Sequence, residues 1–155
     1  MELNKEAPKF SLLDQTGKTH TLAENKGKWV VLYFYPKDLT PGCTVEACNF
    51  RDNLARLSGA GAVVFGVSAD SVKRHEKFAA VEKLNFPILS DESHDALNAY
   101  GVWQQKSMMG KKYMGIVRTT VLIDPAGVVR KIYDSVKVTG HVDEVLGDLA
   151  ALSKG

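Results

Sequence analysis

The chain has 155 residues, of which 45% are hydrophobic and 25% charged, and its formal net charge is +2. A chain of this length buries roughly 68–70% of its unfolded surface, so it needs neither a disulfide nor a metal to hold a core. The charge is balanced and no basic block is longer than Lys111-Lys112, which favours neither a nucleic-acid nor a membrane partner. We therefore expect one soluble domain over residues 1–155.

The N-terminus is polar and lacks the apolar stretch of a signal peptide. No run of the chain approaches the ~20 apolar residues of a membrane helix, so a cytoplasmic protein is predicted. Thiols are kept reduced in that compartment. The only two cysteines, Cys43 and Cys48, are therefore expected to be reactive, metal-binding or inert rather than a permanent cross-link.

Hydrophobic periodicity predicts alternating strands and helices along the chain. A hairpin at 10–13 and 19–22 comes first, around the turn DQTG, and then a strand at 29–35 that is apolar on both faces. The elements expected next are a helix from 40 to about 58, a strand at 62–68, a helix at 71–84, a strand at 86–89 and a helix at 94–100. A loop bearing Gly and Lys leads to a hairpin at 119–124 and 128–133 and a closing helix at 142–152.

This order, β-α-β-α followed by β-β-α, places parallel crossover units before an antiparallel hairpin. Right-handed crossovers put helices on both faces of such a sheet. The predicted fold is therefore α/β, a thioredoxin-like three-layer α/β/α sandwich with a mixed central sheet and an N-terminal hairpin. Fold alone does not fix function.

The stretch Thr40-Pro41-Gly42-Cys43 has the composition of a helix start. Thr40 can cap the helix, and Pro41 suits the first helical position, where its missing N–H costs nothing. Cys43 then lies in the first turn, where unsatisfied backbone N–H groups and the helix dipole favour an anionic sulfur. The preceding strand delivers this turn to the carboxyl edge of the sheet, where α/β proteins place their sites.

Cys43 and Cys48 are five positions apart within this predicted helix. On an ideal helix the spacing gives a rotation of about 140° and a Cα–Cα distance of about 8.6 Å. A disulfide needs Cα atoms within about 7 Å, so any redox coupling must include unwinding of the first turns. Two inert buried cysteines, a metal site and a redox pair are the alternatives. The placement of Cys43 favours the redox pair, since no Cys/His cluster supplies further metal ligands.

The run FYPKDLTPGCTVEACNFRD resembles the peroxiredoxin signature Pro-x-x-x-Thr/Ser-x-x-Cys, in the version with a second cysteine five residues on. This version is similar to the bacterioferritin-comigratory, or peroxiredoxin Q, subfamily. The likeness spans nearly the whole chain, through APKFSLLDQTGKTHTL, FGVSADSVKRHEKF, FPILSDE, YGVW, KKYMGIVRTTVLIDPAG and HVDEVL. Some members take the resolving cysteine from a later helix, near SVKRHEKF, where this sequence has none.

The resemblance implies a thiol-dependent peroxidase that reduces hydrogen peroxide and organic hydroperoxides without cofactor or metal. Cys43 would attack the peroxide and become a sulfenic acid. Cys48 would resolve it as an intramolecular disulfide, which implies a monomer. Thioredoxin or a glutaredoxin-like dithiol would then reduce the disulfide, because the chain has no C-x-x-C of its own.

The resemblance also implies roles for residues around the cysteines. Arg118, which alone would be taken for a surface arginine, would stabilise the thiolate and hydrogen-bond the peroxide. Thr40 would bind peroxide through its hydroxyl, and Pro36 would screen Cys43 from water. Glu46 would orient an arginine, or would be a solvated helix residue near the dipole.

Two further interpretations remain for the chain. The first is a redox-sensing binding protein on the same fold, switched by a Cys43–Cys48 disulfide. The second is a thioredoxin-like scaffold with inert thiols. Trp103 and Met114 are expected at the rim near Cys43. No catalysis is assigned to the histidines, which are expected in turns or on helix surfaces: His20, His75, His94 and His141.

Overall fold

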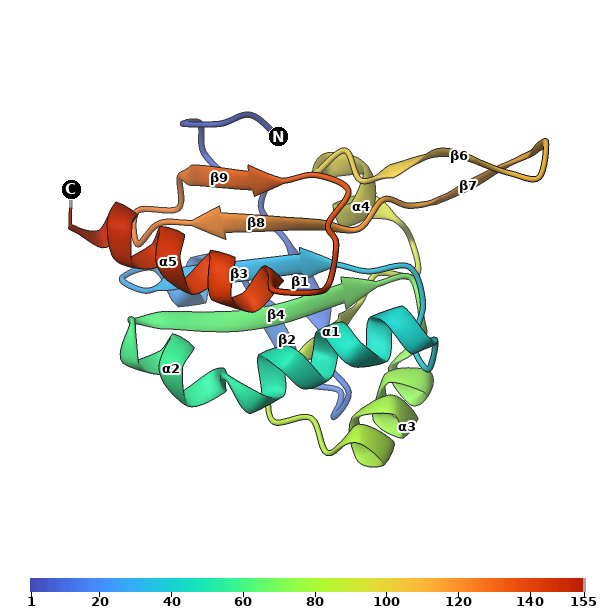
Figure 1. Ribbon diagram of the computed structural model, residues 1–155, viewed down its shortest axis with the longest axis horizontal. Coiled ribbons are helices and arrows are strands. Elements are labelled where there is room, and N and C mark those ends of the chain that lie inside the picture. The colour runs from blue at the N-terminus through green and yellow to red at the C-terminus, as the bar shows by residue number, and fades with distance from the viewer. Residues whose placement is uncertain (155) are drawn as a thin grey trace.

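A computed structural model describes residues 1–154 (Figure 1). The strands are β1 (Ser11–Leu13), β2 (Thr19–Thr21), β3 (Trp29–Phe34), β4 (Ala62–Ser68), β5 (Ile88–Ser90), β6 (Trp103–Met108), β7 (Lys111–Ile116), β8 (Thr119–Ile123) and β9 (Val129–Tyr133). The helices are the 3-10 turn η1 (Ala23–Asn25), α1 (Pro41–Asp52), α2 (Leu54–Gly59), α3 (Val72–Glu82), α4 (Asp95–Ala99) and α5 (His141–Ser153). Within the described residues, no helix combines the length and the apolar character needed to cross a membrane.

A seven-stranded mixed sheet forms the centre of the molecule, in the order β2-β1-β5-β4-β3-β8-β9. Strands β3, β4 and β5 run parallel, whereas β8 is antiparallel to β3 and β9 is antiparallel to β8. The thioredoxin-like α/β prediction is confirmed. The register pairs Phe34, at the end of β3, with Val67 in β4 and with Thr119 at the start of β8. The chain leaving β3 and the chain entering β8 therefore meet at one edge of the sheet.

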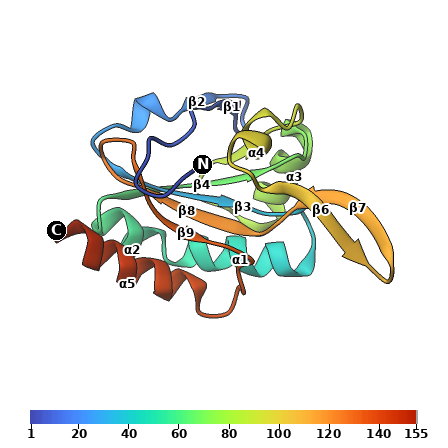
Figure 2. The same ribbon diagram turned by 90° about the horizontal axis from the view of Figure 1, so that it is seen from above.

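Each face of the sheet carries its own hydrophobic core. Side chains alternate along β3, so that Val31 and Tyr33 join the core under α1, α2 and α5. Leu32 and Phe34 join the opposite core with α4 and the N-terminal segment. Figure 2 shows α1, α2 and α5 on one side of the sheet and α4 on the other. Because β3 is covered on both faces, all six of its residues are buried.

The helix expected from 40 to about 58 is two helices. α1 ends at Asp52 and α2 begins at Leu54, because Asn53 leaves helical geometry with φ −110° and ψ 10°. The side-chain amide of Asn53 donates to the Asn49 carbonyl at 2.8 Å. Asparagine often bonds to nearby backbone in this way, which competes with the helix. The single-helix prediction was wrong at this residue.

The segment expected to be a loop before β8 is the hairpin β6–β7, which projects from the body of the molecule (Figure 1). Its two turn residues, Met109 and Gly110, both have positive φ, 52° and 80°. This is the requirement of a two-residue hairpin turn that matches the strand twist. Most residues of both strands are exposed, so the hairpin lacks the apolar alternation by which a strand is recognised.

Burial on α3 also differs from expectation. Phe78 is buried, but Val81 on the same helix is 58% exposed. His75 is fully buried and His141 is 4% exposed, so neither lies on a surface. His75 precedes Phe78 by three residues, so the helical spacing that buries the phenylalanine buries the imidazole too.

Gly66 in β4 makes room for the Tyr33 ring. A Cβ at this position would lie 2.8 Å from Tyr33 Cζ and 2.9 Å from the Tyr33 hydroxyl oxygen. Gly66→Ala is therefore expected to lower the free energy of unfolding by about 1–3 kcal/mol, measured by urea denaturation. Gly147→Ala in α5, where a Cβ would meet nothing within 4 Å, is expected to raise it by about 1 kcal/mol. Changes of the same sign in both variants would contradict this packing argument.

Candidate active site

Cys43 lies in the first turn of α1, buried to 2% exposure at the edge of the sheet where β3 ends and β8 begins. Arg118 directly precedes β8, and its side chain reaches Cys43 at this edge of the sheet. Arg118 Nη2 donates to Cys43 Sγ at 3.3 Å, and Nη1 donates to Glu46 Oε1 at 2.6 Å. The planar guanidinium thus bridges a thiol and a carboxylate that lie three residues apart on one side of α1.

Glu46 is almost fully buried, at 1% exposure, and its ion pair with Arg118 uses only one carboxylate oxygen. Burial raises the pKa of Glu46 to about 7, although Arg118 pulls it the other way. Oε2 has no hydrogen-bond partner within the described residues, and neither does the buried Tyr33 hydroxyl. Each such atom costs about 1–3 kcal/mol of desolvation. Glu46 is thus a buried group whose charge is only partly compensated, not a solvated helix residue.

Thr40 and Pro36 lie in the turn that joins β3 to α1. Thr40 is the N-cap residue of α1, with Pro41 at the first helical position, but its side chain makes no cap. The Thr40 hydroxyl instead donates to the Lys37 carbonyl at 2.8 Å, so the predicted side-chain cap was wrong. Because that bond uses its proton, the hydroxyl keeps lone pairs with which to accept a hydrogen bond.

Half-buried Pro36 lies at the base of the β6–β7 hairpin, where it lines a cavity of about 350 Å³. Trp103 and Met114, expected at the rim of the site, line the same cavity. Cys43 is not among the lining residues. The structure therefore places these two side chains in one cavity with Pro36.

Cys48 contacts a different part of the protein from Cys43. Its Sγ donates to Glu82 Oε2, at the end of α3, at 3.4 Å. Arg51 Nη1 donates to the Glu82 backbone carbonyl at 2.6 Å, which fastens α1 to the same end of α3. Burial and the Glu82 hydrogen bond raise the pKa of the Cys48 thiol. Cys48 is therefore a protonated thiol at neutral pH.

Both cysteines are free, and the helix that carries them is intact from Pro41 to Asp52. This confirms the expectation that an intact helix does not bring the two sulfur atoms together. Arg118, Cys43 and Glu46 form one contiguous group. Cys48 lies outside it.

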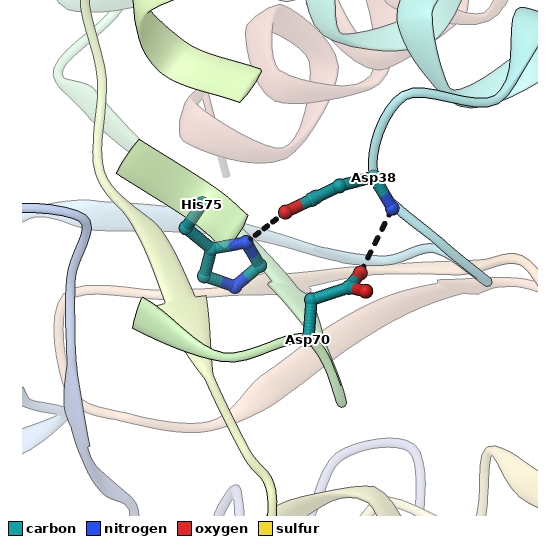
Figure 3. Close-up of side chains that lie close together, drawn as sticks. All are labelled: Asp38, Asp70 and His75. Carbon is teal, nitrogen blue, oxygen red and sulfur yellow. Dashed lines mark hydrogen bonds and ion pairs between the residues drawn. The ribbon is translucent and has the colours of Figure 1, made fainter. Parts of the chain in front are cut away.

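Sequence reasoning missed a buried ionic cluster beside Thr40, formed by Asp38, Asp70 and His75 (Figure 3). One potential metal-ligating atom from each lies within 4.8 Å of the others. Hydrogen bonds already use these atoms: His75 Nδ1 contacts Asp38 and Nε2 contacts the Leu89 carbonyl. The Arg74 guanidinium also lies 3.1 Å from Asp70. We therefore assign no metal to this cluster.

Comparisons with known proteins agree with the geometry. The AhpC/TSA family matches residues 3–132. The chain is 51% identical over 149 residues to a putative peroxiredoxin Bcp of Coxiella burnetii, covering 96% of this chain and 99% of that protein. A cysteine-to-serine variant of PrxQ from Xylella fastidiosa has a TM-score of 0.94 at 36% identity, covering 99% of this chain and 98% of that one. The Xanthomonas campestris bacterioferritin comigratory protein, described for its alkyl peroxide reduction activity, has a TM-score of 0.88 at 43% identity, covering 92% and 90%.

The Cys48–Glu82 contact predicts an effect on thiol reactivity. In a Cys43→Ser background, where Cys48 is the only cysteine, Glu82→Gln is expected to lower the pKa of Cys48 and speed its alkylation at neutral pH. Arg51 and Asp52, the other charged groups near this sulfur, are unchanged. Iodoacetamide rates across a pH series measure the shift. Glu76→Gln, at an exposed position of the same helix, is the matched control, and equal titration midpoints in both variants would contradict the assignment.

The raised pKa of Glu46 predicts a pH-dependent stability. Between its ordinary value of 4.5 and about 7, the folded state binds more protons at Glu46 than the unfolded state does. Stability is therefore lost as pH rises through this window and is fully present below it, with a total of about 3 kcal/mol. Glu46→Gln is expected to remove this loss, seen in urea unfolding at each pH. A pH dependence unchanged from that of the wild type or of Glu76→Gln would contradict it.

Proposed function

The chain belongs to the AhpC/TSA family as a peroxiredoxin of the bacterioferritin-comigratory type, a thiol peroxidase, and we propose that Cys43 is the thiol that peroxide oxidises. The observation that carries the proposal is the contact of Arg118 Nη2 with Cys43 Sγ at 3.3 Å. Of the two cysteines, only Cys43 combines a helix N-terminus with a cation directly on its sulfur.

In the first step the Cys43 thiolate attacks one oxygen of the peroxide. The S–O bond forms, the O–O bond breaks, and the departing oxygen takes up a proton to leave as water or an alcohol. Arg118 stabilises the thiolate and then the charge on the departing oxygen. Thr40 accepts a hydrogen bond from the peroxide, and Pro36 limits access of water. Glu46 orients Arg118 through the second arm of the guanidinium.

Alignment must supply most of the acceleration. For any cysteine, lowering the thiol pKa from ~8.5 to ~6 raises the thiolate fraction at pH 7 only ~30-fold. Holding two reactants in an attacking geometry contributes far more. The turn that carries Thr40 and the first turn of α1 are therefore as important to the proposed reaction as the charge of Arg118.

In the second step Cys48 resolves the sulfenic acid. The S–S bond forms, the S–O bond of Cys43 breaks, and the hydroxyl leaves as water with the proton of Cys48. Because the sulfur atoms of an intact helix cannot meet, α1 unwinds locally. A dithiol then restores both thiols and is itself oxidised.

We propose thioredoxin or a glutaredoxin-like protein as that dithiol. The absence of a C-x-x-C motif in the chain supports an external reductant. The proposed form is a monomer, because both cysteines lie on one helix, and the proposed compartment is the cytoplasm, where reduced dithiols are abundant. Hydrogen peroxide and organic hydroperoxides are the proposed substrates.

Cysteine variants test this cycle. With hydrogen peroxide or cumene hydroperoxide and a thioredoxin couple, Cys43→Ser is expected to abolish peroxide consumption, followed as NADPH oxidation. Cys48→Ser is expected to consume one equivalent of peroxide and then stall, because its sulfenic acid has no partner in the chain. A Cys43→Ser variant that keeps its rate would refute the assignment of Cys43.

The same assay separates the alternatives for Cys48 and for the chain. If Cys48→Ser turns over normally with thioredoxin, Cys48 is not the resolving thiol. If the wild-type protein oxidises once and does not cycle with any dithiol, the redox-sensing interpretation replaces the peroxidase cycle.

A further inference from the structure

Asp38 lies in the turn between β3 and α1, two residues before Thr40, and its side chain is fully buried (Figure 3). Asp38 Oδ1 accepts from the Tyr35 hydroxyl at 2.5 Å, and Oδ2 lies 2.5 Å from His75 Nδ1. Burying an ion pair of this kind carries a large desolvation penalty, which is offset only when every polar atom is hydrogen-bonded.

The backbone of Asp38 is held as firmly as its side chain. Its N–H donates to Asp70 Oδ2 at 2.8 Å, and its carbonyl accepts from Arg74 Nη2 at 3.2 Å. Asp70 lies just after β4, and Arg74 and His75 lie in α3. The N–H, the carbonyl and the side chain of Asp38 therefore each bind the turn before α1 to the β4–α3 junction.

Hydrogen bonding fixes the number of protons in the pair. His75 Nε2 lies 2.9 Å from the Leu89 carbonyl, which can only accept, so Nε2 carries a proton. The Asp38–His75 contact needs one more, either on the imidazole or on the carboxyl group. Both forms have no net charge and satisfy every bond. Removing one partner would leave the other buried and unsatisfied.

A strained residue follows this anchor. Leu39 has φ 66°, in the left-handed region, which costs a non-glycine residue about 1–3 kcal/mol. It lies between anchored Asp38 and Thr40, whose carbonyl accepts the first α1 hydrogen bond from Thr44 at 2.9 Å. Strain of this kind persists only where the surroundings hold it. The anchor at Asp38 supplies that hold on the N-terminal side.

We propose that Asp38 and His75 are a positioning pair for peroxide reduction, which fixes the Lys37–Thr40 turn and so aligns Thr40 and Cys43 with the peroxide. This inference rests on the proposed roles of Cys43 and Thr40. Arg118, arriving from the start of β8, holds the sulfur from one side of the site. The Asp38–His75 pair holds the turn from the other side.

The test compares two reactions of Cys43 in a Cys48→Ser background, where Cys43 is the only cysteine. Attack on the O–O bond needs alignment, whereas alkylation by iodoacetamide needs only an accessible thiolate. Asp38→Ala is expected to slow oxidation of Cys43 by hydrogen peroxide by about tenfold or more, measured by stopped flow. Its alkylation rate is expected to stay within about threefold of wild type, since the contact with Arg118 remains. Asp38→Asn is expected to rescue the peroxide rate, because its amide accepts from Tyr35 and donates to neutral His75.

A milder variant covers the case in which Asp38→Ala does not fold. Tyr35→Phe removes one buried hydrogen bond to Asp38, and the matched control Tyr100→Phe removes one to the Pro8 carbonyl, 2.7 Å long and outside the site. Each is expected to lower the free energy of unfolding by about 1 kcal/mol. Only Tyr35→Phe is expected to slow the peroxide reaction.

Three results would overturn the positioning role. These are a folded Asp38→Ala variant that keeps the wild-type peroxide rate, an equal loss of peroxide and alkylation rates, and equal peroxide rates for Tyr35→Phe and Tyr100→Phe. Failure of the peroxidase assignment is a separate outcome, because it would appear as a Cys43→Ser variant that remains active.

Discussion

The contact of one guanidinium with both Cys43 and Glu46 is the interaction on which the site depends. Arg118 is a cation shared by these two acidic groups. Burial raises the pKa of Glu46 to about 7, so near neutral pH the carboxylate competes with the thiolate for Arg118 only part of the time. A glutamate that was fully ionised would hold the guanidinium more tightly and leave less of its field for the sulfur. The burial of Glu46 thereby leaves more of the Arg118 charge for the sulfur even though it destabilises the fold.

Helix geometry explains why two cysteines on one helix differ in chemistry. A rotation of about 140° directs Cys43 toward the start of β8 and Cys48 toward the end of α3. The first sulfur meets the cation of Arg118, and the second meets the carboxylate of Glu82. These neighbours act in opposite directions, since a cation stabilises a thiolate and a carboxylate keeps a thiol protonated. The spacing that forbids a disulfide in the folded helix also divides the proposed roles of attack and resolution.

The sequence was sufficient to predict an element wherever a local pattern or the family resemblance described it. The apolar run of β3, the Pro41 helix start and the position of Cys43 in the first turn all follow from neighbouring residues. The β6–β7 hairpin escaped prediction because its exposed strands have no apolar alternation. The Asp38–His75 contact escaped because it joins residues 37 apart in the chain, and their meeting depends on how α3 packs after β4. Long-range pairing of polar groups leaves no periodic signal.

The proposed cycle requires the site to hold Cys43 for attack and then to release it for resolution. The contact of Arg118 with the sulfur and the Asp38–His75 pair respond differently to oxidation. Arg118 acts on the sulfur through charge, and conversion of the thiolate to a sulfenic acid removes that charge. The Asp38–His75 pair lies outside α1, and its bonds do not involve the sulfur. In the proposed cycle, oxidation therefore weakens the hold on the first turn of α1 while the turn before it stays anchored, so that unwinding begins at the cysteine and follows the chemical step.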